Sequence, residues 1–201
     1  LAYYDNTLIP LLGDVTDKKI LDYGAGPGLL ALALQKLGAD VKVYDINPDM
    51  REKAGEKIGK ENILPSVESL PKNFFDFVIC NLVLCIVDED EVKRIVEDIH
   101  NVLTESGSAF IGFCNPRIFN VEESNIDKRF PTGAAYEDNH EYKKVKKEGD
   151  YEIIELHRPI EWYEKVYTDA GLKLVNTIFT PVYELGGKKI EDFVIFELKK
   201  A

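Results

Sequence analysis

Apolar runs alternate with helix-like patterns along the first 114 residues of the chain. The apolar run Phe74–Val83 is typical of a central strand that is covered on both faces. In Glu91–Leu103 the apolar positions repeat every three to four residues, which indicates one buried helix face. The pattern predicts strands over 18–23, 41–45, within 61–67, over 74–83 and over 108–114, and helices over 29–37, 48–58 and 91–103. Strands that alternate with helices favour a parallel α/β sheet with right-handed crossovers.

The second half of the chain has a different pattern. Residues 115–158 are polar and weakly periodic, although EYKKVKKE and YEIIELHR flank Gly149-Asp150 and could pair as a hairpin. A helix is predicted over 160–170, followed by two strands, KLVNTIFT and EDFVIFELK, which a turn around Gly186-Gly187 would make antiparallel. We therefore expect a single domain over residues 1–201, with 115–158 as a polar insertion.

Composition narrows the possible partners. The 201 residues carry a formal net charge of −11, which disfavours nucleic acid because phosphate backbones are repelled. No apolar run approaches the roughly 20 residues that span a bilayer, and the first residues lack a basic leader, so neither a membrane nor a signal peptide is expected. Three cysteines without zinc-ligand spacing indicate buried free thiols, a reducing cytoplasm and no metal site.

A cluster of three glycines stands between the first strand and the first helix, in ILDYGAGPGLLALAL. Ligands of open parallel sheets bind at such carboxyl-terminal strand ends. Gly24, Gly26 and Gly28 give G-x-G-x-G, so Leu29 occupies the place of the third glycine in a dinucleotide fingerprint. Asp22 would repel a pyrophosphate but suits a cationic amine. The loop therefore favours a ligand that carries a positive charge near the first strand.

Asp45 ends the second strand, 17 positions beyond Gly28, where a carboxylate can accept hydrogen bonds from ribose hydroxyls. A nucleoside that bears an amino acid instead of a pyrophosphate fits both carboxylates, and S-adenosylmethionine is such a molecule. The alternatives are structural: the glycines could make only a tight turn, Asp45 could serve only helix entry, and Asn81 could be a turn residue. The agreement of Asp22, Asp45 and the strand pattern favours the ligand interpretation.

The segments DYGAGPG, VYDINPDM, SVESLP, FDFVICNLVLCIV and VLTESGSAFIGF appear in this order over residues 18–114. This series resembles the class I S-adenosylmethionine-dependent methyltransferases, and is most similar to their small-molecule branch, which includes quinone-biosynthesis methyltransferases. The resemblance implies a doubly wound, mostly parallel seven-stranded sheet with an antiparallel last strand, and an inserted lid on the substrate side. It implies S-adenosylmethionine as cofactor, S-adenosylhomocysteine as product and a small-molecule acceptor.

The resemblance also implies roles for individual residues. Ser66 replaces the aspartate that commonly contacts the adenine amino group, and Cys85 stands where many relatives have histidine. The methionine end would contact the first-strand residues, the ribose would contact Asp45, the adenine would lie on Ile46, and the sulfonium would lie near Asn81. The expected cofactor-binding residues are Asp22, Gly24, Ala25, Gly26, Gly28, Asp45, Ile46, Ser66, Val67 and Asn81.

The acceptor pocket would be built from the chain start and the insertion, because loops on a rigid sheet commonly carry specificity. Its expected residues are Tyr3, Tyr4, Phe119, Tyr136, His140 and Arg158. His157 is the candidate catalytic base, since its unperturbed pKa lies near neutrality. The alternative for His157 is that it ends a strand and only hydrogen-bonds backbone.

Other functions remain open at this point. A non-catalytic module that holds the cofactor or its product would need the same glycine loop. Leu29 disfavours a nicotinamide-dependent oxidoreductase. A protein or RNA methyltransferase is a further alternative, although NLVL stands where an N-P-P-Y-type motif would follow FDFVIC. The pattern leaves the oligomeric state, the acceptor and the methylated atom open.

Overall fold

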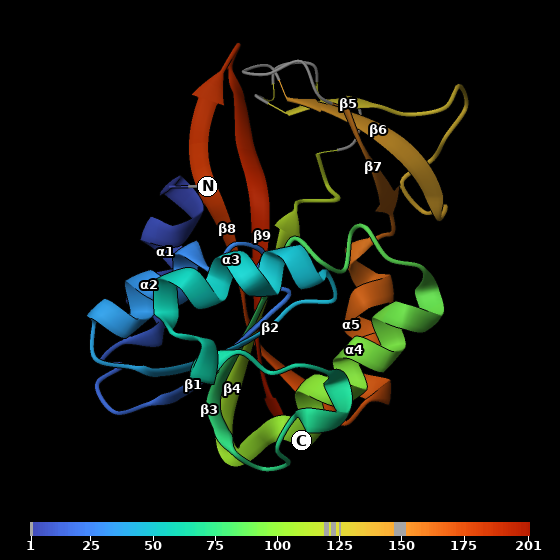
Figure 1. Ribbon diagram of the computed structural model, residues 1–201. Coiled ribbons are helices and arrows are strands. Elements are labelled where there is room, and N and C mark those ends of the chain that lie inside the picture. Colours follow the sequence, from blue (N-terminus) through green and yellow to red (C-terminus); the bar gives the residue numbers. More distant parts are fainter. Residues whose placement is uncertain (1, 119–120, 122–123, 125, 147–151) are drawn as a thin grey trace.

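A six-stranded sheet forms the centre of the molecule in the computed structural model, which describes residues 2–118, 121, 124, 126–146 and 152–201 (Figure 1). Its strands are β1 (Lys19–Tyr23), β2 (Asp40–Tyr44), β3 (Phe75–Asn81), β4 (Leu103–Cys114), β8 (Leu172–Leu185) and β9 (Lys188–Lys200). They lie in the order β2-β1-β3-β4-β9-β8. The first four are parallel, whereas β9 is antiparallel to both β4 and β8. The predicted mostly parallel sheet with an antiparallel last strand is confirmed.

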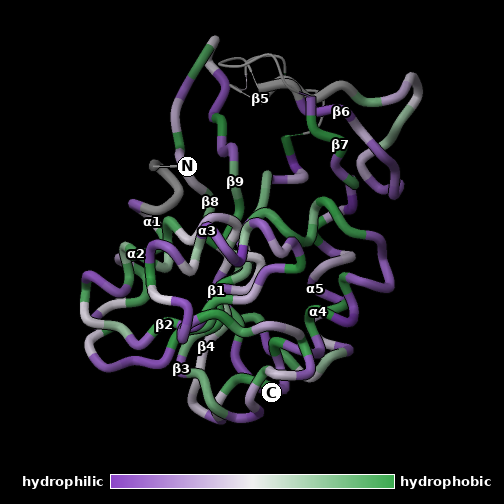
Figure 2. The backbone as a smooth tube through the Cα atoms, in the orientation of Figure 1, coloured by the Kyte–Doolittle hydropathy of each residue, from purple (hydrophilic) through white to green (hydrophobic). Residues whose placement is uncertain are grey.

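Helices cover both faces of this sheet (Figure 1). On one face lie α1 (Ala2–Leu12), α2 (Leu29–Lys36) and α3 (Pro48–Ile58), and on the other lie α4 (Glu89–Val102) and α5 (Ile160–Asp169). Each face therefore has its own apolar core, and Figure 2 shows the hydrophobic stretches gathered along the central strands. None of the helices in the described ranges is long and apolar enough to cross a bilayer.

Side-chain caps fix where two of these helices begin. The Asn47 side chain accepts a hydrogen bond from the Asp49 amide at 2.9 Å, and Pro48 occupies the first turn of α3. The Asp88 side chain accepts from the Glu91 amide at 2.9 Å at the start of α4. Such caps satisfy amides that have no partner inside the helix. The capping residues therefore set both helix entries beside the carboxyl ends of the central strands.

The strand expected within 61–67 is wrong, and the sheet has six strands instead of the predicted seven. Two short 3-10 helices, Lys60–Asn62 and Val67–Ser69, occupy this stretch, and only a single bridge joins Val43 to Ile63. The Leu64 amide donates to the Val43 carbonyl at 2.8 Å, but the next residue is Pro65. Proline has no amide proton, so the ladder along β2 cannot continue.

A second, three-stranded sheet lies beyond the carboxyl ends of the central strands (Figure 1). It consists of β5 (Ile126–Arg129), β6 (His140–Lys146) and β7 (Glu152–His157), all antiparallel. The pairing of β6 with β7 is the predicted hairpin. The Leu156 amide donates to the Cys85 carbonyl at 2.7 Å, which attaches this sheet to the loop after β3. We call β5–β7 the cap sheet.

Gly28 allows α2 and α3 to approach closely. Its φ is +74°, and a Cβ at this position would lie 2.9 Å from the Ala54 Cβ and 3.1 Å from the Ala54 Cα. In the hairpin between β8 and β9, Gly187 has nearly the same φ, +76°, but a Cβ there would meet nothing within 4 Å. Alanine substitutions at the two glycines therefore distinguish the cost of backbone strain alone from the cost of strain plus steric overlap.

We predict that Gly28→Ala lowers the free energy of unfolding by more than Gly187→Ala does. Both substitutions put a Cβ on a residue whose backbone is left-handed, which costs roughly 1–2 kcal/mol. Only Gly28→Ala adds overlap inside a packed core, which costs about 1–3 kcal/mol more. Urea unfolding of the two variants measures the difference. Equal destabilisation would show that α2 can move away from Ala54 without loss.

Candidate functional site

A cavity of about 450 Å³ opens at the carboxyl ends of β1, β2 and β3. This volume lies within the range of roughly 300–1,000 Å³ that is usual for small-molecule sites. Its lining comes from the glycine loop, the end of β2, the loop after β3 and the start of α4, namely Asp22–Pro27, Leu29, Leu30, Tyr44–Ile46, Asn81–Val83, Ile86, Val87, Glu91 and Ile95. The cavity therefore lies where open parallel sheets bind ligands.

The three glycines of the loop have different surroundings. All have left-handed backbones, with φ values of +75° at Gly24, +53° at Gly26 and +74° at Gly28. A Cβ on Gly24 would lie 2.3 Å from the Val83 Cγ2, so this glycine is required by the loop after β3. A Cβ on Gly26 would meet nothing within 4 Å, and Gly26 lines the cavity. Gly26 is thus the position where a ligand can reach the backbone.

Asp45 connects the glycine loop to the start of α3. Its Oδ2 accepts a hydrogen bond from the Gly26 amide at 2.8 Å, and its Oδ1 accepts from the Asn47 amide at 2.8 Å. The residue is only 9% exposed, yet it lines the cavity. A carboxylate has about four acceptor positions, so two amides leave further positions for ligand hydroxyls. Asp45 can therefore hold the loop and bind a diol at the same time.

Asp22 and Asn81 come from neighbouring central strands. Asp22 is 3% exposed near the end of β1, and β1 is paired with β2 on one side and β3 on the other. Asn81 is the last residue of β3, and both side chains belong to residues that line the cavity. Burial, and then the Asp22 charge, raise the pKa of the neighbouring Cys80 thiol. Asp22, which lines the cavity, thus places a buried carboxyl group beside Cys80.

Ile46 and Leu29 form an apolar rim with Ile86. Their exposed fractions are 75%, 62% and 53%, although all three line the cavity. Large apolar side chains held in water at a cavity mouth are available to pack on a flat apolar ligand surface. The predicted contact of Ile46 with a base is compatible with this position.

Ser66 and Val67, by contrast, are not among the residues that line the cavity. The Ser66 amide donates to the Ser69 hydroxyl oxygen at 3.3 Å, and the Ser69 hydroxyl donates to the Ser66 carbonyl at 2.5 Å. The Ser66 side chain also hydrogen-bonds the Glu68 carboxylate. The pKa of that carboxylate is lowered first by the Glu68 backbone amide and then by this bond from Ser66. Val67 packs against the core. The polar groups of Ser66 are therefore engaged locally.

Sequence reasoning missed four residues of the cavity lining, Tyr23, Tyr44, Glu91 and Ile95. The two tyrosine rings meet edge to face at 5.2 Å, and the Tyr23 hydroxyl donates to the Asp98 carboxylate at 3.2 Å. Burial raises the pKa of both phenols, so they stay neutral hydrogen-bonding groups at neutral pH. The four-residue spacing of Glu91 and Ile95 would have placed them on one helix face, but nothing in the sequence directs that face toward a ligand.

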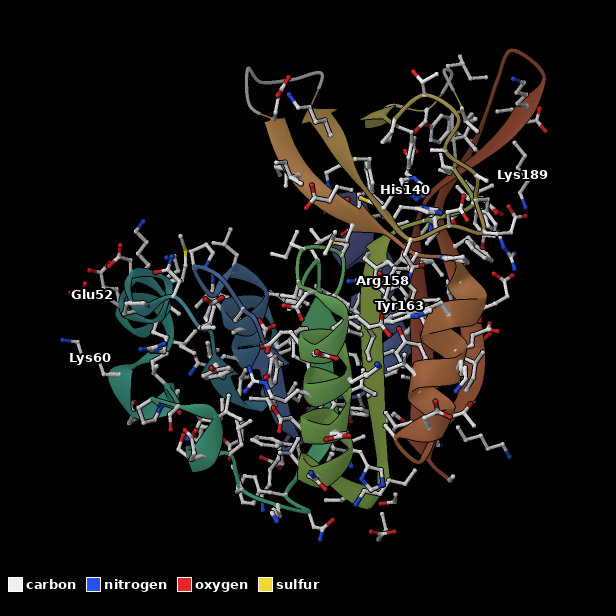
Figure 3. The ribbon with its side chains drawn as sticks, turned by 90° about the vertical axis from the view of Figure 1, so that its right-hand side faces the viewer. Glu52, Lys60, His140, Arg158, Tyr163 and Lys189 are labelled. Atoms are coloured by element: carbon white, nitrogen blue, oxygen red, sulfur yellow. The ribbon has the colours of Figure 1, made fainter. Side chains whose placement is uncertain are left out.

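Of the expected acceptor and catalytic residues, His140 and His157 lie in the cap sheet and Tyr136 lies in the loop between β5 and β6, and none of these three lines the cavity. His157 is 3% exposed, its Nε2 lies 2.8 Å from the Tyr136 carbonyl, and its ring stacks on His140 with centroids 4.9 Å apart. The Tyr136 hydroxyl accepts from the Ile160 amide at 3.0 Å and donates to Glu161 at 3.0 Å, so it caps α5. Figure 3 shows His140 in the cap sheet, well above α5. This geometry supports the backbone-bonding alternative for His157.

Arg158 braces the loop after β3. The side chain is 4% exposed, and it donates to the Leu84 carbonyl at 3.1 Å and to the Val87 carbonyl at 2.7 Å. Its guanidinium lies 4.9 Å from the Trp162 ring centroid and points toward Tyr163 in Figure 3. Leu82, Val83, Ile86 and Val87 of this loop line the cavity. Arg158 is therefore placed to shape the site from behind, not to contact an acceptor.

The remaining expected acceptor residues lie outside the part of the chain whose side chains are described. Tyr3 and Tyr4 belong to α1, but their side chains are outside the described set, and Phe119 is outside the described residues altogether. In the described ranges, no group of three or more His, Cys, Asp or Glu side chains is placed to hold a metal ion. Cys80, Cys85 and Cys114 are buried free thiols.

Known proteins resemble this chain in part of its sequence. Residues 21–111 match a protein-family model described as a methyltransferase domain. The ribosomal protein L11 methyltransferase of Staphylococcus haemolyticus is 29% identical over 100 residues, which cover 46% of this chain and 30% of that protein. The chain thus spans about a third of the length of the curated relatives that it matches.

Solved structures resemble the whole fold. An S-adenosylmethionine dependent methyltransferase from Mesorhizobium loti has a TM-score of 0.71 at 16% identity. The match covers 97% of this chain and 96% of the chain in that structure. A 1,6-didemethyltoxoflavin-N1-methyltransferase from Burkholderia thailandensis, with bound 1,6-didemethyltoxoflavin and S-adenosylhomocysteine, has a TM-score of 0.65 at 16% identity and covers 98% and 76%. The shared architecture confirms the predicted fold, a mostly parallel sheet with an antiparallel last strand, and the family model places its similarity to methyltransferase domains over residues 21–111. They do not single out the small-molecule branch.

We predict that Arg158→Met destabilises the protein by about 2–3 kcal/mol, because two buried carbonyls lose a charged donor. Amide hydrogen exchange over residues 82–87 should also become faster, since the loop loses its brace. Lys165→Met is the matched control, because the Lys165 side chain is 74% exposed on α5 and pairs only with exposed Asp169 in the described contacts. Equal stabilities and equal exchange in the two variants would contradict the bracing role.

Proposed function

We propose that this chain binds S-adenosylmethionine in the cavity at the glycine loop and transfers its methyl group to a small-molecule acceptor. The observation that carries the proposal is the open space at Gly26 in a cavity that Asp22 and Asp45 also line. The backbone at Gly26 carries no side chain where a ligand must come close. The two carboxylates lie near the ends of the adjacent strands β1 and β2.

The chemistry of these side chains fits this cofactor better than a dinucleotide. A buried carboxylate at Asp22 would repel a pyrophosphate, but it stabilises an α-amino group. Asp45 accepts from the two ribose hydroxyls with the acceptor positions that its backbone partners leave. Ile46, on the apolar rim, covers the base. These assignments place the methionine end near β1 and β3, and the nucleoside near β2.

When bound, S-adenosylmethionine supplies a methyl group that its sulfonium already activates. The protein then has mainly to orient and align, and alignment alone contributes up to about 7–11 kcal/mol in favourable cases. Asp22, Asp45 and the glycine loop hold the donor in position, while Asn81 and the Arg158-braced loop bound its reactive side. A base is needed only if the acceptor must lose a proton. His157 is buried and bonded to backbone, so we assign it no catalytic step.

The cap sheet supports a small-molecule acceptor, because it covers the carboxyl-end side of the central strands (Figure 1). The Burkholderia thailandensis structure, which has the same fold, contains a small heterocycle beside S-adenosylhomocysteine. A protein acceptor is the second candidate, since the curated relatives are named for methylation of ribosomal protein L11.

Calorimetric titration with S-adenosylmethionine, S-adenosylhomocysteine and NAD tests the cofactor. The proposal expects micromolar affinity for the two sulfur nucleosides and none for NAD. Tight NAD binding, or no binding of either sulfur nucleoside, would overturn it. Transfer of a labelled methyl group to a panel of small molecules, or to ribosomal protein L11, then separates the two acceptor classes. Cofactor binding without transfer to any acceptor would favour a non-catalytic binding module.

We predict that Asp45→Asn weakens S-adenosylhomocysteine binding at least tenfold, equivalent to about 1.4 kcal/mol. The amide keeps one acceptor oxygen, but its NH₂ group opposes a backbone amide and cannot accept from a ribose hydroxyl. Asp49→Asn is the control, because Asp49 is an exposed neighbour on α3. Circular dichroism checks that the variant is folded. Unchanged affinity in folded Asp45→Asn would remove Asp45 from the ribose site.

A further inference from the structure

The cavity continues beyond the residues that hold the amino acid and the ribose. Its lining also includes Tyr44 from β2 and Glu91 from the first turn of α4. Glu91 is the third carboxylate of the described lining; Asp22 lies in β1, Asp45 directly follows β2 and Glu91 lies in α4. Neither the ribose nor the methionine end of the proposed cofactor accounts for this third carboxylate.

The Glu91 side chain is held in a defined orientation. Its carboxylate accepts two hydrogen bonds from Arg94, one of them from Nε at 3.0 Å, and its backbone amide is fixed by the Asp88 cap. The side chain is 27% exposed. A bidentate guanidinium occupies one acceptor position on each oxygen and leaves others for a second donor. Glu91, which lines the cavity, therefore has a preoriented carboxylate with further acceptor positions.

The segment that was expected to read the base packs close to α4. Val67, which follows Ser66, packs against the apolar core that includes Tyr44 and the α4 residue Ile95, and both of these residues line the cavity. Ser66 itself does not line the cavity and exchanges hydrogen bonds with Ser69. Glu91, on α4, does line the cavity.

We propose that Glu91 accepts a hydrogen bond from the exocyclic 6-amino group of the adenine, and so selects adenosine over 6-oxo nucleosides. The inference rests on the proposed cofactor. It matches three carboxylates to the three donor groups of that molecule: the α-amino group to Asp22, the ribose diol to Asp45 and the 6-amino group to Glu91. A 6-oxo base would instead place a carbonyl oxygen against a carboxylate, and both groups are acceptors.

Binding of S-adenosylhomocysteine and of S-inosylhomocysteine, its 6-oxo analogue, tests the proposal directly. The unmodified protein should prefer the adenosyl compound about tenfold or more, because the analogue leaves a carboxylate facing an acceptor. Glu91→Gln offers an amide that can donate to the 6-oxo group or accept from the 6-amino group. The preference should therefore fall by about tenfold in Glu91→Gln, mostly through tighter binding of the inosyl compound.

Glu89→Gln is the matched control, since Glu89 lies in the same helical turn, pairs with Lys93 and does not line the cavity. The ratio of its affinities for S-adenosylhomocysteine and S-inosylhomocysteine should equal that of the unmodified protein. If Glu91→Gln binds S-adenosylhomocysteine but keeps the full preference, the inference is wrong. A fall in the ratio in Ser66→Ala instead would also overturn it and return the role to Ser66. If neither nucleoside binds the unmodified protein, the proposed cofactor itself fails.

Discussion

The hydrogen bond between the Asp45 carboxylate and the Gly26 amide is the contact on which the site depends. It joins two loops that belong to different β-α units, and the second Asp45 oxygen ties the same carboxylate to the entry of α3. Gly26 needs this support because its backbone is left-handed and no side chain packs around it. A loop that must stay open for a ligand cannot be stabilised by filling it. Its conformation is instead fixed from the side by a buried acceptor that also faces the cavity.

The flanking glycines show the same division between packing and ligand access. Gly24 lets Val83 approach, and Gly28 lets α3 pack on α2, so both are required by neighbouring protein atoms. The loop that carries Val83 is in turn held by Arg158, which lies between β7 and α5. The cavity walls thus derive their rigidity from contacts that no ligand makes.

Local patterns predicted most of the fold, because strand and helix periods and the turn around Gly186-Gly187 are encoded within a few residues. The missing strand within 61–67 shows the limit, since an apolar stretch predicted a strand that Pro65 ends after one bridge. At the site, the residues near the strand ends, Asp22 and Asp45, could be predicted from spacing. Arg158 and Glu91 could not, because their roles depend on how α5 and α4 pack against a loop distant in sequence.

A crystal structure of the protein grown with S-adenosylhomocysteine tests the central claim most directly, because it locates the ligand relative to both carboxylates. The account predicts the nucleoside in the cavity, with the ribose hydroxyls on Asp45, the amino group beside Asp22 and the backbone of Gly26 against the ligand. A nucleoside bound elsewhere, or in this cavity with its ribose turned away from Asp45, would contradict the account.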